Sequence, residues 1–456
     1  MGLLCYSDDF SGVVGGLLTP SLLDPYYSEI ARQVLNYRES HKKCPGAHTL
    51  DLVTSLKEQF PDHAPIYEEI YQSILETKDG LNAEYLLKRA TSFVKHQKMK
   101  RGISRAVDLL QRGDETSVAE AERELRSSLS ETTELFDPGI LLQDATKSLA
   151  FLDRSYEAFP TGIERIDSVA LGPGRKRLHL FVALTGQGKS WWCVNLAKNA
   201  LIAGLKVAYV SLELDAEEVC KRLIQSFFSV SQWDREVYYP LFERDELGRF
   251  LSLASRTVTR PNFSDTNIRP LLEEKLEGLA RRPPVYVRQF PTGSLTMREL
   301  EGYLDGLEAG CKFIPDLLIV DYPDLMSFDA TDYRISVGQV YKKLRGIAIE
   351  RNMAVAAVSQ AHRAAKGASV LTEASVAEDF SKVQTADVVI TYNQTIDEYE
   401  LGLARLFVAK GRTAADKFTV LISQAYGIGQ FVMDSVGMVS SYWEHIRRER
   451  DEEDAE

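Results

Sequence analysis

Residues 183–190 read Ala-Leu-Thr-Gly-Gln-Gly-Lys-Ser, between a mostly apolar run at 178–184 and a helix-permissive stretch at 191–201. A strand, a glycine loop and a helix in this order form the setting of a phosphate-binding P-loop. In such a loop Gly186 and Gly188 let backbone N–H groups approach a polyphosphate, Lys189 reaches the β- and γ-phosphates, and the Ser190 hydroxyl can bind Mg²⁺. The stretch predicts hydrolysis of a nucleoside triphosphate, against the alternative of a turn without ligand. The predicted nucleotide-binding residues are Ala183 (where the common pattern has glycine), Leu184, Thr185, Gly186, Gln187, Gly188, Lys189 and Ser190.

The composition is that of a globular protein with a large core. The chain has 456 residues, of which 44% are hydrophobic and 26% charged, and we expect two or three domains. Residues 1–8 lack a basic segment and no uncharged apolar span of about 18 residues occurs, so we expect a cytoplasmic protein without signal peptide or membrane helix. Five scattered cysteines without a CxxC pair indicate reduced thiols. The net charge of −12 argues against a surface that coats nucleic acid everywhere, but not against a local basic channel.

The hydrophobic pattern changes along the chain. Residues 1–100 have helical spacing and predict an all-α N-terminal domain, and 101–154 predict a helical linker region that includes a short helix at 140–152. Residues 155–440 alternate short β-rich runs with helices, which is typical of an α/β domain with a mostly parallel sheet. Residues 441–456 form a charged tail whose acidic end, 451–456, we expect to be mobile and solvated.

Seven strands are predicted in the α/β domain, at 178–184, 207–212, 317–321, 354–359, 388–392, 403–409 and 418–422. Ligands of open α/β sheets gather at the carboxyl ends of the strands, so we expect the polar residues at these ends to converge on the P-loop.

Two acidic residues follow such strands. Glu213 comes after the second strand and can orient the water that attacks a γ-phosphate, with a surface or capping acid as the alternative. Asp215 and Glu218 have the spacing of a capping box for the next helix. Asp321 ends the third strand and, together with the P-loop, predicts a Walker B carboxylate that holds Mg²⁺ through water.

Three further residues follow later strands. Gln360 could sense the γ-phosphate, with a buried strand-end amide as the alternative. Lys410 and Arg412 end the sixth strand and could reach a phosphate in a neighbouring subunit, with a solvated turn as the alternative.

Together with Thr161-Gly162-Ile163, these motifs resemble the ATPase domain of DnaB-type replicative DNA helicases, including phage-encoded members. The resemblance covers 160–425 strongly and 1–150 loosely. It implies a RecA-like fold, a homohexameric ring with ATP and Mg²⁺ between subunits, and unwinding of duplex DNA by translocation on single-stranded DNA. It also implies a bacterial or phage-infected cytoplasm, with a primase and a helicase loader as partners. Carried over to this chain, Lys189 and Ser190 bind phosphate and metal, and Glu213, Asp321, Gln360, Lys410 and Arg412 have the roles given above. Arg222 lies where the family also carries an arginine, and the resemblance implies that it helps to bind the nucleotide, with a helix-surface ion pair as the alternative.

The chain departs from the family in its DNA-contacting loop, where residues 375–382 replace the common D-L-R-E-S-G. Arg363, Lys366 or Lys382 could supply the phosphate contacts instead, with solvated surface as the alternative. Residues 231–296 add material without an evident purpose. Two other functions remain open at this point: a RecA-like ATPase that acts as an assembly switch, and a helicase-loading adaptor with a vestigial ATPase core.

Overall fold

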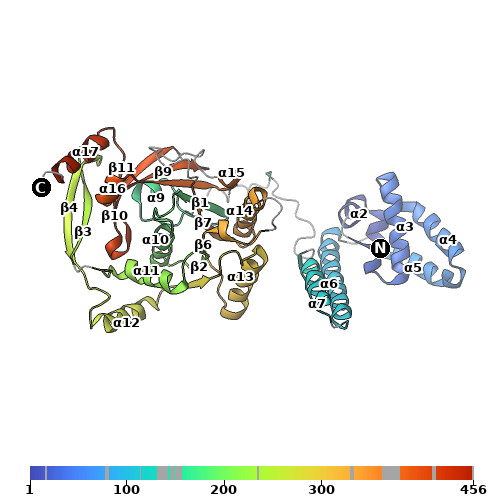
Figure 1. Ribbon diagram of the computed structural model, residues 1–456. Helices are drawn as coiled ribbons and strands as arrows, with labels where there is room; N and C mark the ends of the chain where they lie inside the picture. The colour runs from blue at the N-terminus through green and yellow to red at the C-terminus, as the bar shows by residue number, and fades with distance from the viewer. Residues whose placement is uncertain are drawn as a thin grey trace. The chain divides into compact units, whose positions relative to one another are not determined.

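The computed structural model describes residues 1–15, 18–77, 82–112, 114–130, 142–143, 149, 157–233, 236–328, 333–361, 381–412 and 417–453. The chain forms two compact units, Met1–Asp153 and Arg154–Glu456 (Figure 1). The predicted helix at 140–152 falls almost entirely outside the described residues.

The first unit is helical. Helix α3 begins after Asp24, whose side chain accepts a hydrogen bond from the Tyr26 amide, with Pro25 at the first helical position. Ile30 and Val34 of this helix are buried in the core of the unit. Helix α6 runs across the predicted boundary at residue 100, so the first unit does not end there. The helices are α1 Gly2–Tyr6, α2 Asp8–Gly15, α3 Pro25–His41, α4 Thr49–Gln59, α5 Ala64–Thr77, α6 Ala83–Leu110 and α7 Glu115–Ser130.

The second unit is built on a nine-stranded sheet with the order β11-β10-β9-β8-β1-β7-β6-β2-β5. The strands from β5 to β8 are parallel, and β9, β10 and β11 follow as antiparallel neighbours. All seven predicted strands are present, whereas β5 and β11 of this sheet were not predicted. The strands are β1 Arg177–Ala183, β2 Val207–Ser211, β5 Val285–Gln289, β6 Leu317–Asp321, β7 Ala354–Gln360, β8 Val388–Asn393, β9 Leu403–Gly411, β10 Phe418–Ala425 and β11 Gln430–Gly437.

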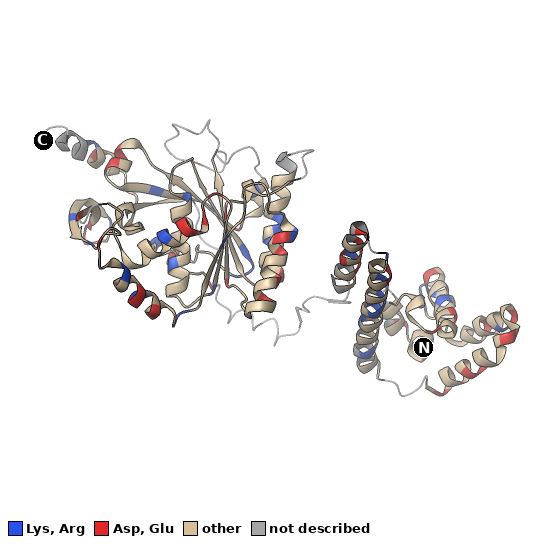
Figure 2. Cartoon of the chain, turned by 60° about the horizontal axis from the view of Figure 1, so that its bottom comes forward, with Lys and Arg blue, Asp and Glu red and all other residues tan. Residues whose placement is uncertain are grey.

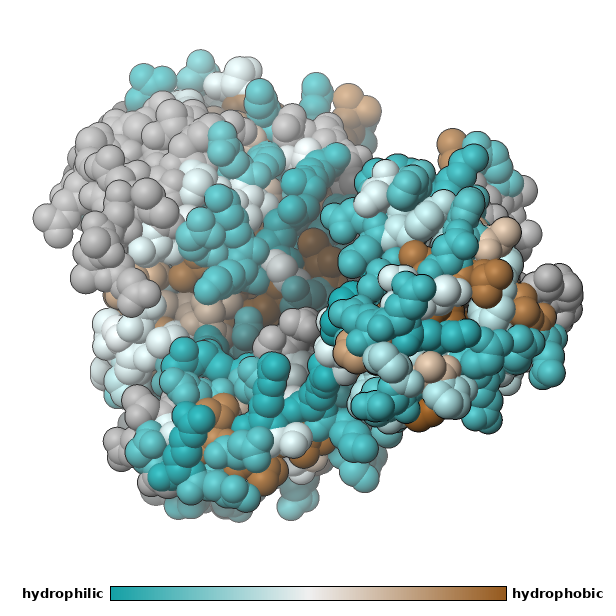
Figure 3. Space-filling model, turned by 90° about the vertical axis from the view of Figure 1, so that its right-hand side faces the viewer, coloured by the Kyte–Doolittle hydropathy of each residue, from teal (hydrophilic) through white to brown (hydrophobic). Residues whose placement is uncertain are grey.

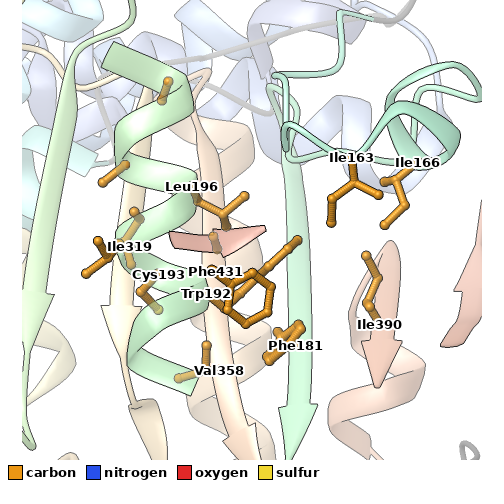
Figure 4. Close-up of a cluster of buried hydrophobic side chains, with 14 of the residues drawn as sticks. Ile163, Ile166, Phe181, Trp192, Cys193, Leu196, Ile319, Val358, Ile390 and Phe431 are labelled. Atoms are coloured by element: carbon orange, nitrogen blue, oxygen red, sulfur yellow. The ribbon is translucent and has the colours of Figure 1, made fainter. Parts of the chain in front are cut away.

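Helices cover both faces of this sheet, which is why its central strands are buried on both sides. On β1, Phe181 packs into one core with Trp192 and Phe431 (Figure 4), whereas Leu180 and Val182 belong to the core on the other face. The first core includes helices α10 Lys189–Ile202 and α11 Ala216–Phe228, and the short α9 Glu164–Asp167. The second includes α13 Met297–Cys311, α14 Tyr333–Glu350 and α15 Ser381–Thr385. Figure 2 shows charged residues mainly on the helices and few on the central strands.

The unassigned region 231–296 contains an antiparallel hairpin, β3 Glu236–Arg244 and β4 Phe250–Thr259, followed by α12 Ile268–Leu279. Its turn is fixed by Asp245, whose carboxylate accepts hydrogen bonds from the amides of Leu247 and Arg249. Phe242 and Phe250 of the hairpin pack with Tyr442 in a separate small core beside the antiparallel strands.

The chain's last helix, α17 Tyr442–Glu453, corrects the prediction of a separate tail from residue 441. Tyr442 and Ile446 are buried, and the Tyr442 hydroxyl donates a 2.8 Å hydrogen bond to Glu398 in α16 Ile396–Glu400. The domain therefore continues at least to Ile446, because its small core needs the first turns of this helix.

The surface seen in Figure 3 is mostly hydrophilic, with hydrophobic residues in scattered patches. None of the helices in the described ranges is both long and apolar enough to cross a membrane.

Candidate nucleotide-binding site

The P-loop joins the end of β1 to the first turn of α10, as the sequence predicts. Gly186 and Gly188 have φ angles of 79° and 71°, in the left-handed region that favours glycine. At Gly188 a side chain would also collide with a neighbour, because a Cβ there would lie 2.5 Å from the Tyr426 hydroxyl oxygen. The loop can therefore present its backbone N–H groups only with glycine at this position.

Lys189 is buried at the N-terminal end of α10, and its Nζ donates a 3.2 Å hydrogen bond to the Leu184 carbonyl. Burial lowers the pKa of Lys189, and the carboxylates of Glu213 and Asp321 counteract this effect. A buried cation that is held against a carbonyl oxygen within the loop itself is available to a phosphate group that enters the loop.

Asp321 is fully buried at the end of β6. Its Oδ2 accepts a 3.0 Å hydrogen bond from the Tyr209 hydroxyl, whereas its Oδ1 has no hydrogen-bond partner among the described residues. Burial raises the pKa of Asp321, and the Ser190 and Tyr209 hydroxyls oppose this by stabilising the charged form. A buried carboxylate oxygen without a partner is costly, and the neighbouring hydroxyl of Ser190 completes a pair of oxygen donors that suits Mg²⁺.

Glu213 lies in the loop after β2 and is exposed. Ser211 at the end of β2 pairs in register with Asp321, which brings the two strand ends together. The charge of Glu213 acts on both Lys189 and Asp321, so the three groups share one site.

The predicted capping box after Glu213 does not form. Asp215 precedes α11 without a side-chain capping bond, and its carboxylate instead accepts a 2.7 Å hydrogen bond from Gln289 in β5. Glu218 forms an ion pair with Arg222 at 2.9 Å. Both acids have alternative partners that the local sequence does not reveal.

Gln360 ends β7 and pairs in register with Ala183 at the end of β1. Its side-chain amide donates to the Thr185 hydroxyl within the P-loop. The structure thus brings Gln360, Lys189 and Asp321 to one edge of the sheet.

Arg222 forms the ion pair that the sequence analysis gives as its alternative role. Besides the ion pair with Glu218, its guanidinium carbon lies 5.2 Å from the centre of the Trp191 ring. Trp191 directly follows the P-loop. Together with Arg222, Tyr426 and Trp233 it lines a cavity of about 220 Å³. Aromatic rings beside a guanidinium suit a planar group of a nucleotide.

Lys410 and Arg412 lie elsewhere, which corrects the expectation that all strand-end residues converge on the P-loop. Strand β9 is antiparallel to β8, and Gly411 pairs with Val388 at the start of β8. The end of β9 therefore lies at the edge of the sheet opposite the P-loop. The two edges are separated by the length of β8, which is about 17 Å for five steps of about 3.3 Å per residue. Lys410 donates to the carbonyls of residues 383 and 384, and Arg412 forms a 3.0 Å ion pair with Asp387.

The three residues predicted to contact DNA are Arg363, Lys366 and Lys382. Arg363 and Lys366 lie outside the described residues. Lys382 is buried and forms a 2.8 Å ion pair with Asp324, so its ammonium group is not displayed to solvent as a DNA contact requires. This prediction for Lys382 is therefore not supported by its environment.

Two contributors to the site were not predicted. Tyr209 holds Asp321 from the middle of β2, and the Tyr322 ring lies 5.9 Å from the Lys189 ammonium. A tyrosine inside an apolar strand indicates a buried hydroxyl that needs a partner, which is the one signal that the sequence offers for Tyr209.

The fold and the site define a P-loop nucleotide-binding protein with a mostly parallel sheet. More specifically, the chain belongs to the family of the DnaB-like helicase C-terminal domain, whose model matches residues 158–425.

The chain is similar to named replicative helicases at low identity. It is 23% identical over 205 residues to the replicative DNA helicase DnaB of Nostoc sp., covering 45% of this chain and 20% of that protein. It is 24% identical over 226 residues to the DnaB-like replicative helicase of Enterobacteria phage T4 (48% and 42%), and 26% identical over 263 residues to DnaB of Haemophilus influenzae (55% and 50%). The chain thus matches half or less of the length of each of these relatives.

Solved structures support the fold. A DnaB-like replicative helicase, described with its interactions with primase, is similar with a TM-score of 0.59 at 17% identity, over 95% of this chain and all of that chain. A separate ATPase domain is similar with a TM-score of 0.51 at 17% identity, over 67% of this chain and all of that domain.

Proposed function

We propose that this protein is an ATP-driven replicative DNA helicase that works as a homohexameric ring on single-stranded DNA. Membership in the DnaB-like family supports the activity. The observation that carries the proposal is the division of the catalytic groups between two edges of one sheet. Lys189, Asp321 and Gln360 lie at one edge, and Arg412 lies at the opposite edge.

This division is what a site shared between subunits requires. Arg412 is too far from the P-loop of its own chain to touch the same phosphate. Its side chain is 46% exposed even with Asp387 as a partner, so it can be offered to a neighbouring copy. An arginine supplied by a neighbour stabilises the charge that develops during phosphoryl transfer.

Within one subunit each residue has a separate task. The P-loop amides and Lys189 bind the β- and γ-phosphates, and Glu213 orients the attacking water and accepts its proton. Gln360 contacts the P-loop through Thr185, where the loss of a γ-phosphate can change that contact. Ser190 and Asp321 would hold Mg²⁺, which would neutralise charge on the phosphate oxygens.

The measurement that tests this function combines ATPase rates, with and without single-stranded DNA, and the mass of the assembly with a nonhydrolysable nucleotide. We expect a six-subunit species and hydrolysis that single-stranded DNA stimulates. Hydrolysis that is indifferent to DNA would favour an assembly switch, and absence of hydrolysis would favour a loading adaptor.

Arg363 and Lys366 remain the proposed contacts to the DNA backbone. Removing both charges should reduce the slope of log affinity for single-stranded DNA against log salt by about one to two units. An unchanged slope would exclude them as phosphate contacts. We propose a primase as a partner because one similar solved structure is described with its interactions with primase. Co-elution of the full chain with a cognate primase tests that step.

A further inference from the structure

Lys382 and Asp324 form a buried ion pair that no catalytic step described above uses. Their Nζ and Oδ1 atoms are 2.8 Å apart, and the side chains are 7% and 10% exposed. Burying two charges is expensive and is tolerated when further hydrogen bonds satisfy both groups.

Those further bonds join four elements. The Ser359 hydroxyl of β7 donates to Asp324 Oδ2 at 2.9 Å, and the Tyr341 hydroxyl of α14 donates to Oδ1 at 3.1 Å. Lys382 of α15 also contacts Ser359 Oγ at 3.2 Å, and its ammonium lies 5.4 Å from the centre of the Tyr341 ring. Asp324 itself belongs to η4, Pro323–Leu325, directly after β6. We call these four residues the buried polar cluster.

The cluster is next to the catalytic edge in sequence and in space. Asp324 lies three residues after Asp321, and Ser359 directly precedes Gln360. The carboxylate of Asp324 also acts on Lys189, whose pKa it helps to raise against the effect of burial. The cluster thus connects the ends of β6 and β7, which carry the metal-binding carboxylate and the γ-phosphate sensor, to α14 and α15 on one face of the sheet.

Stability alone is a weak reason for such a pair. Well-packed apolar side chains of similar volume often stabilise a fold as much as a buried ion pair does, whereas a directed ion pair fixes the relative position of the elements that carry it. Here those elements are the two strand ends that must be correctly placed for hydrolysis.

We propose that Lys382 and Asp324 are positioning residues for ATP hydrolysis: their ion pair holds the ends of β6 and β7, and with them Asp321 and Gln360, in register with the P-loop. This inference rests on the proposed function, since it assigns a role in the turnover of the same site. Neither residue contacts the nucleotide in this account, so nucleotide binding should depend on the pair much less than turnover does.

The test uses the full chain with Asp324→Asn and Lys382→Met together. Removing both charges avoids the unpaired buried charge that each single change would leave. The asparagine carbonyl oxygen can still accept from one of the Ser359 and Tyr341 hydroxyls, and its amide group can donate to the other hydroxyl oxygen. We expect a folded hexamer that binds a nonhydrolysable ATP analogue within about threefold of wild type, whereas kcat for ATP falls about tenfold or more. Lys382→Arg, which keeps the charge, should retain more of the wild-type kcat than the double variant does.

The matched control is Arg175→Met with Asp316→Asn. Asp316 directly precedes β6, so this ion pair lies at the end of the strand away from Asp321. The Asp316 carboxylate also accepts a hydrogen bond from the backbone amide of Lys206. Its removal should lower the melting temperature without lowering kcat.

A double variant of Asp324 and Lys382 with wild-type kcat would overturn the positioning role. So would an equal loss of kcat in the control, since the effect would then follow from stability alone. Wild-type ATP turnover should be lost in Lys189→Ala. If the wild-type protein showed no such turnover, the proposed function would be wrong, and the positioning role, which depends on it, would be wrong as well.

Discussion

At the scale of single residues, the catalytic assignments rest on where charges are buried and where they are exposed. Asp321 and Lys189 are buried with few protein partners, which suits groups that wait for a metal and a phosphate. Glu213 is exposed and close enough to affect both, which suits a base that needs access to water. The environments of Glu213 and of the buried His179 each give a prediction.

Glu213→Gln should preserve ATP binding and assembly and lower kcat by about 10²-fold or more, because the amide cannot accept a proton from the attacking water. Steady-state ATPase rates and binding of a nonhydrolysable analogue measure the two effects separately. Glu217→Gln, an exposed acid in the next helix, is the matched control and should keep wild-type turnover. Equal rates for the Glu213 variant and this control would move the base elsewhere.

His179 predicts a pH dependence of stability. It is buried in β1 and stacks on Trp192, and burial lowers its pKa from 6.5 to about 4. Between these values the unfolded chain binds more protons than the folded chain, so stability is lost as pH falls from about 7 toward 4. His179→Leu should remove about 2 kcal/mol of the stability change between pH 7 and pH 5, as measured by denaturant unfolding at both values. Identical pH profiles for variant and wild type would show that His179 is not held neutral.

At the scale of elements, the hairpin β3–β4 is a packed part of the second unit. Phe250 is 5% exposed and contacts the rings of Phe242 and Tyr442 edge to face. Phe250→Ala should destabilise the unit by about 3–5 kcal/mol because it leaves a cavity in this small core. Leu247→Ala, in the exposed turn of the same hairpin, should change stability by less than about 0.5 kcal/mol. Similar unfolding midpoints for the two variants would contradict this packing.

The sequence predicts those elements whose signal is local. The seven predicted strands are mostly apolar runs, and the P-loop is recognised from its own residues. Strand β5 is short and ends in Arg288 and Gln289, and β3 contains Pro240, which argues against a strand when only the sequence is considered. The direction of β9 depends on its pairing with β8, which no local pattern encodes. The sequence favours an exposed position for Lys382. Its ion-pair partner Asp324 is 58 residues away, so the local sequence does not reveal that Lys382 is buried.

At the scale of the whole molecule, the proposed helicase needs active sites that form between copies of the chain. Arg412→Ala should leave each P-loop intact and reduce ATPase activity about 10³-fold or more, because the neighbour's phosphate loses its positive charge. In mixed rings of Arg412→Ala and Glu213→Gln subunits, some interfaces join an intact Glu213 to an intact Arg412. Partial activity should therefore return, although neither parent ring has such an interface.

As a control for the mixing experiment, native mass measurement must show that mixed rings assemble. If they assemble and stay inactive at every ratio, diluting each variant into wild-type rings separates two explanations. A linear loss of activity would indicate that Arg412 acts within its own subunit, and a steeper loss would indicate that hydrolysis needs every interface.

The most direct test of the central claim is strand separation on a forked DNA duplex with single-stranded arms, followed by release of a labelled strand. The full chain with ATP and Mg²⁺ should release the strand, and neither a nonhydrolysable analogue nor the Lys189→Ala variant should support release. Hydrolysis that DNA stimulates but that releases no strand would contradict the account, because the protein would then be an ATPase that responds to DNA without unwinding it.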